Sequence, residues 1–296
     1  MTKELPNKHL VARSFGQAAA QYDDVAVLQR QTGDELLDRL SLVTLQPERI
    51  LDLGVGTGRN LSLLAKRYPK AELVAIDIAT GMLKQARQNY QHSIGLKRWL
   101  PMTSTPHYLA GDAEQLPLAD NSVDLIFANL ALQWCDPRMS FAEIQRVLRP
   151  DGLLMFTTLG PDTLYELRTA WAAVDDYPHV NMFYDMHDVG EAMMEAGLAE
   201  PVLDTDRYVL TYQTPLELMK DLKVLGAHNV NSGRRRGLTG RKAFAQVTEA
   251  YEQFRQDKLL PATYEVVYGH AWGSKPKQQQ DNGDVHIPIS QIQGRK

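Results

Sequence analysis

The chain has 296 residues, of which 44% are hydrophobic and 23% charged, a composition typical of a globular protein. Its 32 basic and 36 acidic residues give a net charge of −4, which argues against a general affinity for nucleic acid. One cysteine (Cys135), no apolar run of membrane-spanning length and no signal-peptide core predict a cytoplasmic protein with no internal disulfide, no membrane segment and no nucleic-acid partner.

Residues 8–40 are predicted to be helical, because apolar side chains such as Val11 and Phe15 recur at helical spacing. The pattern is interrupted at residues 21–24, where Tyr22 lies. Judged on its neighbours alone, Tyr22 is either a packing residue, which is the commoner role, or the tip of a lid over a ligand.

A glycine-rich turn follows the first predicted strand, in the run Ile50-Leu51-Asp52-Leu53-Gly54-Val55-Gly56-Thr57-Gly58. Glycines leave room for a ligand to approach the backbone, and the following helix directs its free N–H groups at the same place. Nicotinamide and flavin folds use similar turns. A carboxylate at Asp52, however, suits an ammonium group better than a pyrophosphate. The run therefore favours S-adenosylmethionine over a turn that binds nothing.

Apolar segments alternate with helical ones from residue 49 onward. The strands are expected at residues 50–55, 72–78, 107–110, 123–129 and 153–158, with a helix at 82–90 and a polar insertion at 92–106. Near-continuous apolar strands between helices predict a parallel sheet covered on both faces, with ligands at the carboxyl ends of its strands.

Acidic residues follow two further strands, and both are candidates for binding a nucleoside. Asp77 lies at the end of the second strand, where a carboxylate can accept both ribose hydroxyls. Asp112 and the backbone N–H of Ala113 can accept from and donate to an adenine edge. Each acid alone is more often a helix cap or a loop residue, but together with Asp52 they indicate a nucleoside site.

The segment after the fourth strand offers further polar groups. Asn129 and Gln133 supply amides and Trp134 a flat wall, although a capped helix with a core tryptophan would look the same. A turn at Pro150-Asp151-Gly152 is expected to lead into the fifth strand.

The second half is expected to carry substrate contacts. A helix is predicted to start at Pro161 with Asp162 in its first turn. The remaining elements are expected as helices at 189–196 and 216–225, strands at 207–212 and 264–272, and an apolar piece at 286–292. Between glycines lie Arg234, Arg235 and Arg236, which suit carboxylates or phosphates, although a solvated basic loop is the commoner role. The histidines show no metal-ligand spacing, so no metal is expected.

Residues 50–158 resemble the class I S-adenosylmethionine-dependent methyltransferases. The resemblance implies an α/β fold with a seven-stranded, mostly parallel, Rossmann-like sheet, helices on both faces and the last strand antiparallel near the edge. It also implies a cofactor site in which Asp52 and the glycines hold the methionine part, Asp77 the ribose, and Met82, Asp112 and Ala113 the adenine. The cofactor-binding residues expected are Asp52, Gly54, Gly56, Gly58, Asp77, Met82, Asp112, Ala113 and Asn129.

Nearly the whole chain is similar to one family, the malonyl-acyl-carrier-protein O-methyltransferases of biotin synthesis. The similarity is carried by residues 17–24, 128–135, 159–168, 179–190 and 233–241. It implies a malonyl substrate on acyl carrier protein or coenzyme A whose free carboxylate receives the methyl group. Because carboxyl groups are already ionised at neutral pH, no general base is expected. The residues expected to orient it are Tyr22, Gln133 and Trp134, and those expected to bind it are Asn181, His187, Arg234, Arg235 and Arg236.

This resemblance divides the chain into an N-terminal helical lid (1–45), a cofactor-binding core (46–160) and a remainder with substrate-recognition insertions (161–296). Two alternatives stay open. One is another methyltransferase acting on a small carboxylate or a quinone precursor. The other is an assembly factor that binds S-adenosylmethionine without transferring a methyl group.

Overall fold

The computed structural model describes residues 6–94, 105–227, 229 and 240–274. The basic run Arg234, Arg235 and Arg236, most of the 92–106 insertion and the predicted apolar piece at 286–292 lie outside the described residues.

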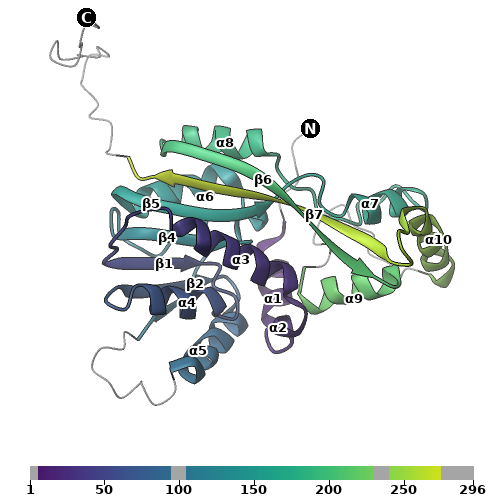
Figure 1. The fold of residues 1–296 in the computed structure, drawn as a ribbon, viewed down its shortest axis with the longest axis horizontal. Coiled ribbons are helices and arrows are strands. Elements are labelled where there is room, and N and C mark those ends of the chain that lie inside the picture. The colour runs from purple at the N-terminus through teal and green to yellow at the C-terminus, as the bar shows by residue number, and fades with distance from the viewer. Residues whose placement is uncertain (1–5, 95–104, 228, 230–239, 275–296) are drawn as a thin grey trace, which may run out of the picture.

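A seven-stranded sheet forms the centre of the molecule, in the order β3-β2-β1-β4-β5-β7-β6 (Figure 1). The strands are β1 (Arg49–Leu53), β2 (Glu72–Asp77), β3 (His107–Ala110), β4 (Val123–Asn129), β5 (Leu148–Leu159), β6 (Ala199–Tyr212) and β7 (Leu260–Trp272). Neighbours from β3 to β5 are parallel, and β7 runs antiparallel to both β5 and β6. The predicted mostly parallel sheet with an inserted antiparallel strand is confirmed.

Helices cover both faces of this sheet, as predicted. They are α1 (Lys8–Ala18), α2 (Tyr22–Val25), α3 (Val27–Leu40), α4 (Arg59–Arg67), α5 (Thr80–Ile94), α6 (Pro137–Val147), α7 (Tyr165–Ala172), α8 (Met186–Glu195), α9 (Pro215–Val224) and α10 (Arg241–Tyr251), with short 3-10 turns η2 (Leu132–Trp134) and η3 (Glu252–Phe254). No helix within the described ranges is both long enough and apolar enough to cross a membrane.

Adjacent strand residues face opposite sides of the sheet, because side chains alternate along a strand. Ile50 of β1 packs in one buried cluster with α3, α4 and α5, whereas its neighbour Leu51 packs in another with α6 and α8. Both faces of the sheet are therefore shielded from water, which is why the strands are continuous apolar runs in the sequence.

The predicted helical region at 8–40 is three helices with different roles. α3 buries Leu28, Leu36 and Leu40 in the main core, so it is part of the central domain. We call α1 and α2 the lid; its residues Phe15 and Tyr22 pack on a separate small cluster made by Ala19, Ala79 and Met82.

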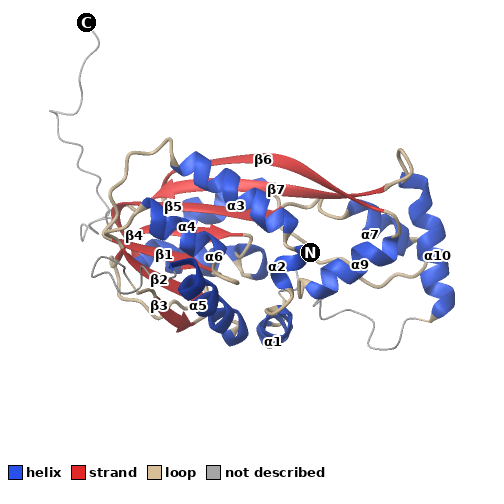
Figure 2. Cartoon of the chain, turned by 60° about the horizontal axis from the view of Figure 1, so that its bottom comes forward, coloured by secondary structure: helices blue, strands red, loops and turns tan. Residues whose placement is uncertain are grey.

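β6 and β7 extend well beyond the other strands, and α7, α9 and α10 gather at their far end (Figures 1 and 2). Both strands are longer than predicted: β6 starts at Ala199 and β7 at Leu260. The exposed residues of β6 alternate with half-buried ones, so its first half lacked the apolar run that marked the other strands.

The predicted helix start at Pro161 is wrong, because α7 begins only at Tyr165. Residues 161–164 are instead tied to β7: the backbone N–H of Asp162 donates to the Glu265 carboxylate, and that of Leu164 donates to the Thr263 carbonyl.

The predicted turn at 150–152 is a bulge within β5. Asp151 has φ +62, and the pairing with β4 is interrupted between Leu148 and Leu153. Pro150, Asp151 and Gly152 are residues that favour a turn, but the chain does not reverse its direction there. β5 resumes its parallel pairing with β4 after the bulge.

Candidate active site

Two adjoining cavities open where the carboxyl ends of β1, β2 and β4 face the lid. The first has a volume of about 680 Å³ and the second about 720 Å³, open sides included. Four residues line both cavities, namely Phe15, Tyr22, Leu130 and Trp134. The ring of Phe15 lies 5.3 Å from that of Trp134 and 6.5 Å from that of Tyr22. An aromatic wall, made by the N-terminal residues Phe15 and Tyr22 and by the distant Trp134, thus separates the two cavities.

The glycine turn lines the first cavity at Gly54 and Gly56, and all three glycines have positive φ. A Cβ at Gly56 would meet nothing within 4 Å, so this backbone borders open space that a ligand can fill. Gly58 does not line the cavity. A Cβ there would lie 2.9 Å from the Cβ of Ala86, so this glycine lets α4 pack closely on α5.

Asp77, at the end of β2, both lines the first cavity and holds the glycine turn. Its Oδ2 accepts the Gly56 N–H at 2.9 Å and its Oδ1 accepts the Ala79 N–H at 2.8 Å. Burial raises the pKa of Asp77 to about 6, and these two hydrogen bonds work against the rise. A carboxylate has about four acceptor positions, so capacity remains for ribose hydroxyls.

Asp52 lies behind the turn and lines neither cavity. It is 2% exposed, and its Oδ2 has no hydrogen-bond partner within the described residues. Burial, followed by the charge of Asp77, raises the pKa of Asp52 to about 8. An uncompensated buried carboxylate is the setting in which a nearby ligand cation is favourable.

The first cavity is also lined by Met82, Asp112 and Ala113, the residues expected to contact the adenine. Met82 is 1% exposed and belongs to the small cluster beneath the lid. Asp112 Oδ1 accepts hydrogen bonds from the Glu114 N–H at 3.1 Å and from Lys8 Nζ at 2.8 Å.

Asn129 lines the first cavity, but its amide is already engaged in the fold. Its Oδ1 accepts from the hydroxyls of Thr32 and Thr157, and its Nδ2 donates to the Gln29 carbonyl. These bonds attach α3 to the ends of β4 and β5. The contacts favour a positioning function for Asn129 over direct ligand contact.

Of the three residues predicted to orient the substrate, Tyr22 and Trp134 belong to the wall between the cavities, and Gln133 lines only the second cavity. Tyr22 borders both cavities, and burial beside Asp77 and Asp23 raises the pKa of its phenol, which therefore stays protonated. Gln133 lines the second cavity; its Nε2 donates to the Leu130 carbonyl at 2.6 Å, and its buried Oε1 has no partner in the described part of the chain. Trp134 is half-buried in the wall, not in the core.

The second cavity lies between the lid, α7, α9 and the segment before α8. Among the predicted substrate residues, Asn181 lines it and is 7% exposed. His179 also lines it: its Nε2 lies 2.8 Å from Asp175 Oδ1, and its ring stacks on Trp171 at 3.7 Å. No lysine or arginine of the described residues lines this cavity.

Other predicted substrate residues are not brought to the cavities within the described residues. His187 is exposed in the first turn of α8 and lines neither cavity. Arg234, Arg235 and Arg236 lie outside the described residues, although Asn229, five positions before Arg234, lines the second cavity.

Sequence reasoning missed three site residues: Lys8, Phe15 and His179. Phe15 carried only the periodicity of a core residue, and His179 was considered only as a possible metal ligand and set aside because the histidines lack metal-ligand spacing. Lys8 had a weak signal, because a cation in the first turn of a helix is unfavourable unless something outside the helix compensates it.

The chain is similar to known methyltransferases in both sequence and fold. Residues 51–156 match the family model described as "Methyltransferase domain". A malonyl-acyl-carrier-protein O-methyltransferase from Laribacter hongkongensis is 49% identical over 280 residues, 94% of each chain, and one from Methylovorus is 49% identical over 289 residues, 96% of this chain and 95% of the relative. A crystal structure from Bacillus halodurans, described as a methyltransferase, is 18% identical, with a TM-score of 0.58 over 82% of this chain and all of that one.

Proposed function

The chain belongs to the malonyl-acyl-carrier-protein O-methyltransferases, and we propose that it transfers a methyl group from S-adenosylmethionine to the free carboxylate of malonyl-acyl-carrier protein. The observation that carries the proposal is the pair of cavities that share an aromatic wall. A methyl donor in one and an acyl group in the other would meet at Tyr22 and Trp134.

The chemistry of its lining supports S-adenosylmethionine as the ligand of the first cavity. The open side of Gly56 admits a ligand against the backbone, and Asp77 offers acceptor positions to ribose hydroxyls. The unpartnered Oδ2 of Asp52 provides a negative charge behind the turn for the methionine ammonium. When bound, the cofactor supplies a methyl group activated on a sulfonium. We assign the methionine part to the glycine turn and the adenine to Met82, Asp112 and Ala113.

The second cavity is where we place the malonyl group and its phosphopantetheine arm. Asn181, Gln133 and His179 supply polar groups on a wall that is otherwise mainly apolar. His179 lies beside the Asp175 carboxylate, so its Nε2 carries the proton and the ring is held in one orientation. In the sequence, Arg234, Arg235 and Arg236 follow Asn229, which lines this cavity, and we assign to them the binding of an acidic carrier protein.

Methyl transfer to a carboxylate places few demands on proton chemistry. Carboxyl groups have pKa values near 4, so the malonyl oxygen is already ionised at neutral pH. The protonated Tyr22 cannot act as a general base, but its hydroxyl can donate a hydrogen bond to the carboxylate. The chain's contribution is therefore to align the carboxylate with the methyl group and to exclude water; alignment can supply up to roughly 7–11 kcal/mol. The same proposal places the protein in the cytoplasm, without a membrane partner. It also gives the reaction a role in biotin synthesis.

The test is mass spectrometry of malonyl-acyl-carrier protein after incubation with the protein and S-adenosylmethionine. We expect one added methyl on the malonyl group and none on acetyl-acyl-carrier protein, which differs only in lacking the free carboxylate. Parallel incubations with malonyl-coenzyme A, trans-aconitate and a demethylated quinone identify the alternatives. Methylation of the quinone precursor or trans-aconitate, with none on the malonyl carrier, would show the proposal to be wrong.

A further inference from the structure

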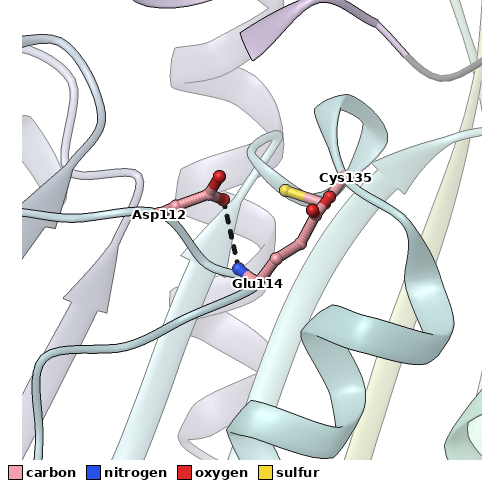
Figure 3. Close-up of side chains that lie close together, drawn as sticks. All are labelled: Asp112, Glu114 and Cys135. Atoms are coloured by element: carbon pink, nitrogen blue, oxygen red, sulfur yellow. Dashed lines mark hydrogen bonds between the residues drawn. The ribbon is translucent and has the colours of Figure 1, made fainter.

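A compact anionic group borders the first cavity, and the lid supplies a lysine to its centre. Asp112 and Glu114 follow β3, and Cys135 follows η2; their ligand atoms lie within 4.8 Å of one another (Figure 3). Such a set could in principle hold a metal ion. The Lys8 ammonium takes that place: its Nζ lies 2.8 Å from Asp112 Oδ1, 2.8 Å from Glu114 Oε1 and 3.4 Å from Cys135 Sγ.

The position of Lys8 is unfavourable for the helix that carries it. It is the first residue of α1, whose first turn contains no acid, so its charge opposes the helix dipole. Its side chain is only 23% exposed, so desolvation adds to the cost. A lysine held in such a place needs compensation from outside the helix, and the contacts with Asp112 and Glu114 provide it.

The protonation states fit an ammonium enclosed by two carboxylates. Burial works against the charge of Lys8, but the contacts with Asp112 and Glu114 outweigh it and raise the pKa of Lys8 above its ordinary value. Burial raises the pKa of Cys135 to about 12, so the sulfur is a thiol at neutral pH. The two carboxylates are then the charge partners, and the thiol fills the remaining side.

The contacts of Asp112 are divided between its two oxygens. Oδ1 takes both Lys8 and the Glu114 N–H, whereas Oδ2 has no hydrogen bond to any described residue. Asp112 lines the first cavity, so the oxygen that faces no protein donor is the one left for a ligand. Lys8 thereby fixes which way the carboxylate is turned.

We propose that Lys8 is a positioning residue for the cofactor: it holds the Asp112 carboxylate oriented so that Oδ2 meets the exocyclic amino group of adenine, and it holds α1 over the first cavity. This inference rests on the proposed use of the first cavity for S-adenosylmethionine. It assigns two linked effects to one ammonium group, namely recognition of the base and closure of the lid.

The experiment compares two ligands that differ only at the base. Calorimetry measures the affinities of S-adenosylhomocysteine and S-inosylhomocysteine, in which a carbonyl replaces the amino group. The variants are Lys8→Met, which keeps a long side chain without charge, and Lys8→Arg, which keeps the charge. Arg39→Met is the matched control, because Arg39 of α3 pairs with Asp204 on β6 and lines neither cavity. Thermal unfolding without ligand checks that each variant is folded.

In the wild-type protein we expect at least about tenfold preference for the adenosyl ligand, since a site built for a donor rejects an analogue without it. Lys8→Met should lower the affinity for S-adenosylhomocysteine at least fivefold and reduce the preference at least threefold. Lys8→Arg should keep most of the preference, and Arg39→Met all of it.

A merely structural lid contact would weaken both ligands by the same factor. Equal losses, or no loss in a folded Lys8→Met protein, would therefore overturn the proposal. If the wild-type protein binds S-adenosylhomocysteine but methylates no malonyl carrier, only the substrate assignment fails. If it binds neither ligand, the cofactor assignment and this inference fail together.

Discussion

Two buried carboxylates behind one glycine turn dominate the electrostatics of the site at the residue scale. Asp52 and Asp77 have pKa values raised to about 8 and about 6, mainly by burial, and the charge of Asp77 adds to the rise at Asp52. A cationic ligand next to the turn would favour the ionised form of both. The two carboxylates are therefore less readily ionised in the free protein than beside a bound cationic ligand.

We predict that cofactor binding releases protons and tightens as pH rises from 6 to 8. In the free protein, pH 7 lies below the raised pKa of Asp52, so its carboxyl group is mostly protonated. A bound ammonium group, in contrast, favours the ionised carboxylate. Because the free state holds the additional proton, raising the pH favours the complex, by up to about tenfold per unit for one proton. Calorimetry in phosphate and in Tris, whose ionisation enthalpies differ, measures the proton count; a heat that does not depend on the buffer would contradict the assignment.

Asp52→Asn provides the control for this linkage. It should bind the cofactor more weakly and release fewer protons. It should also unfold at a higher temperature than the wild-type protein at pH 8 without ligand. The reason is that a carboxyl with a raised folded pKa binds more protons folded than unfolded, so it costs stability as pH rises from about 4 to 8.

We predict that Tyr22→Phe lowers kcat by no more than a few-fold. The phenol is kept protonated by burial, so it can orient the substrate but cannot remove a proton. Loss of a proton-transfer residue typically costs 10²–10⁴-fold. The rate with saturating substrate should be nearly flat from about pH 6 to 8.5 where chemistry limits it. A steep ionisation near pH 7 that disappears in His179→Ala would reveal a base in the second cavity and favour a phenol or carbon substrate.

At the scale of elements, the lid is held over the first cavity by an unusually close helix contact. α1 crosses the first turn of α5 where Gly16 meets Gly81, and a Cβ at Gly81 would lie 2.5 Å from the Gly16 carbonyl oxygen. Together with the Lys8 contacts, this approach keeps Phe15 and Tyr22 at the wall between the cavities.

We predict that Gly81→Ala displaces the lid although alanine is the better helix former. Alanine favours a helix interior by about 1 kcal/mol over glycine, so α5 itself should not suffer. The new Cβ would meet backbone, which cannot rotate away, so α1 must shift. Affinity for S-adenosylhomocysteine should fall about fivefold or more, and proteolysis within residues 8–25 should accelerate.

Gly16→Ala is the matched control across the same contact. Its Cβ would have Gly81 N as its nearest neighbour, at 4.0 Å, which is ordinary van der Waals contact. We expect wild-type affinity and proteolysis. Similar losses in both variants would mean that helix propensity or general destabilisation, not the close approach, governs the lid.

At the scale of the whole molecule, the chain divides the work between its two halves. The described residues that line the first cavity all come from the first half of the chain. Residues of α7 and α9 help to line the second cavity. These two helices lie at the far end of the long β6–β7 pair (Figure 1). The wall of that cavity continues to Asn229, from which the chain runs on to Arg234. Carrier recognition is therefore expected at this end of the molecule.

We predict that replacing Arg234, Arg235 and Arg236 with Gln raises the KM for malonyl-acyl-carrier protein and leaves cofactor affinity unchanged. Rim charges mainly steer the encounter, so the wild-type rate at low substrate should fall with added salt and that of the variant should depend on salt less. Steady-state kinetics at low and high salt measure both effects. If the variant has wild-type kinetics at low salt, these arginines do not contact the carrier protein, and the alternative of a solvated basic loop is favoured.

The sequence by itself determined the central sheet and much of the lining of the first cavity. The apolar runs of β1, β2 and β4 mark strands buried on both faces, and parallel strands bring their carboxyl ends to one edge. Gly56, Asp77 and Asp112 could therefore be placed together before any coordinates, because each follows its strand directly. Local chemistry and strand direction are readable from short segments.

Only the tertiary structure decided the functions of residues whose partners lie far along the chain. Lys8 and Asp112 are 104 positions apart, and the amide of Asn129 reaches Gln29 and Thr32 on α3. His179 lines the second cavity whereas His187, eight residues later, is exposed on α8 and lines neither cavity, although both belong to the same polar stretch. Such assignments depend on how helices cross and on which side of a helix faces the sheet. Those choices are set by packing over the whole molecule, and no local pattern of residues carries them.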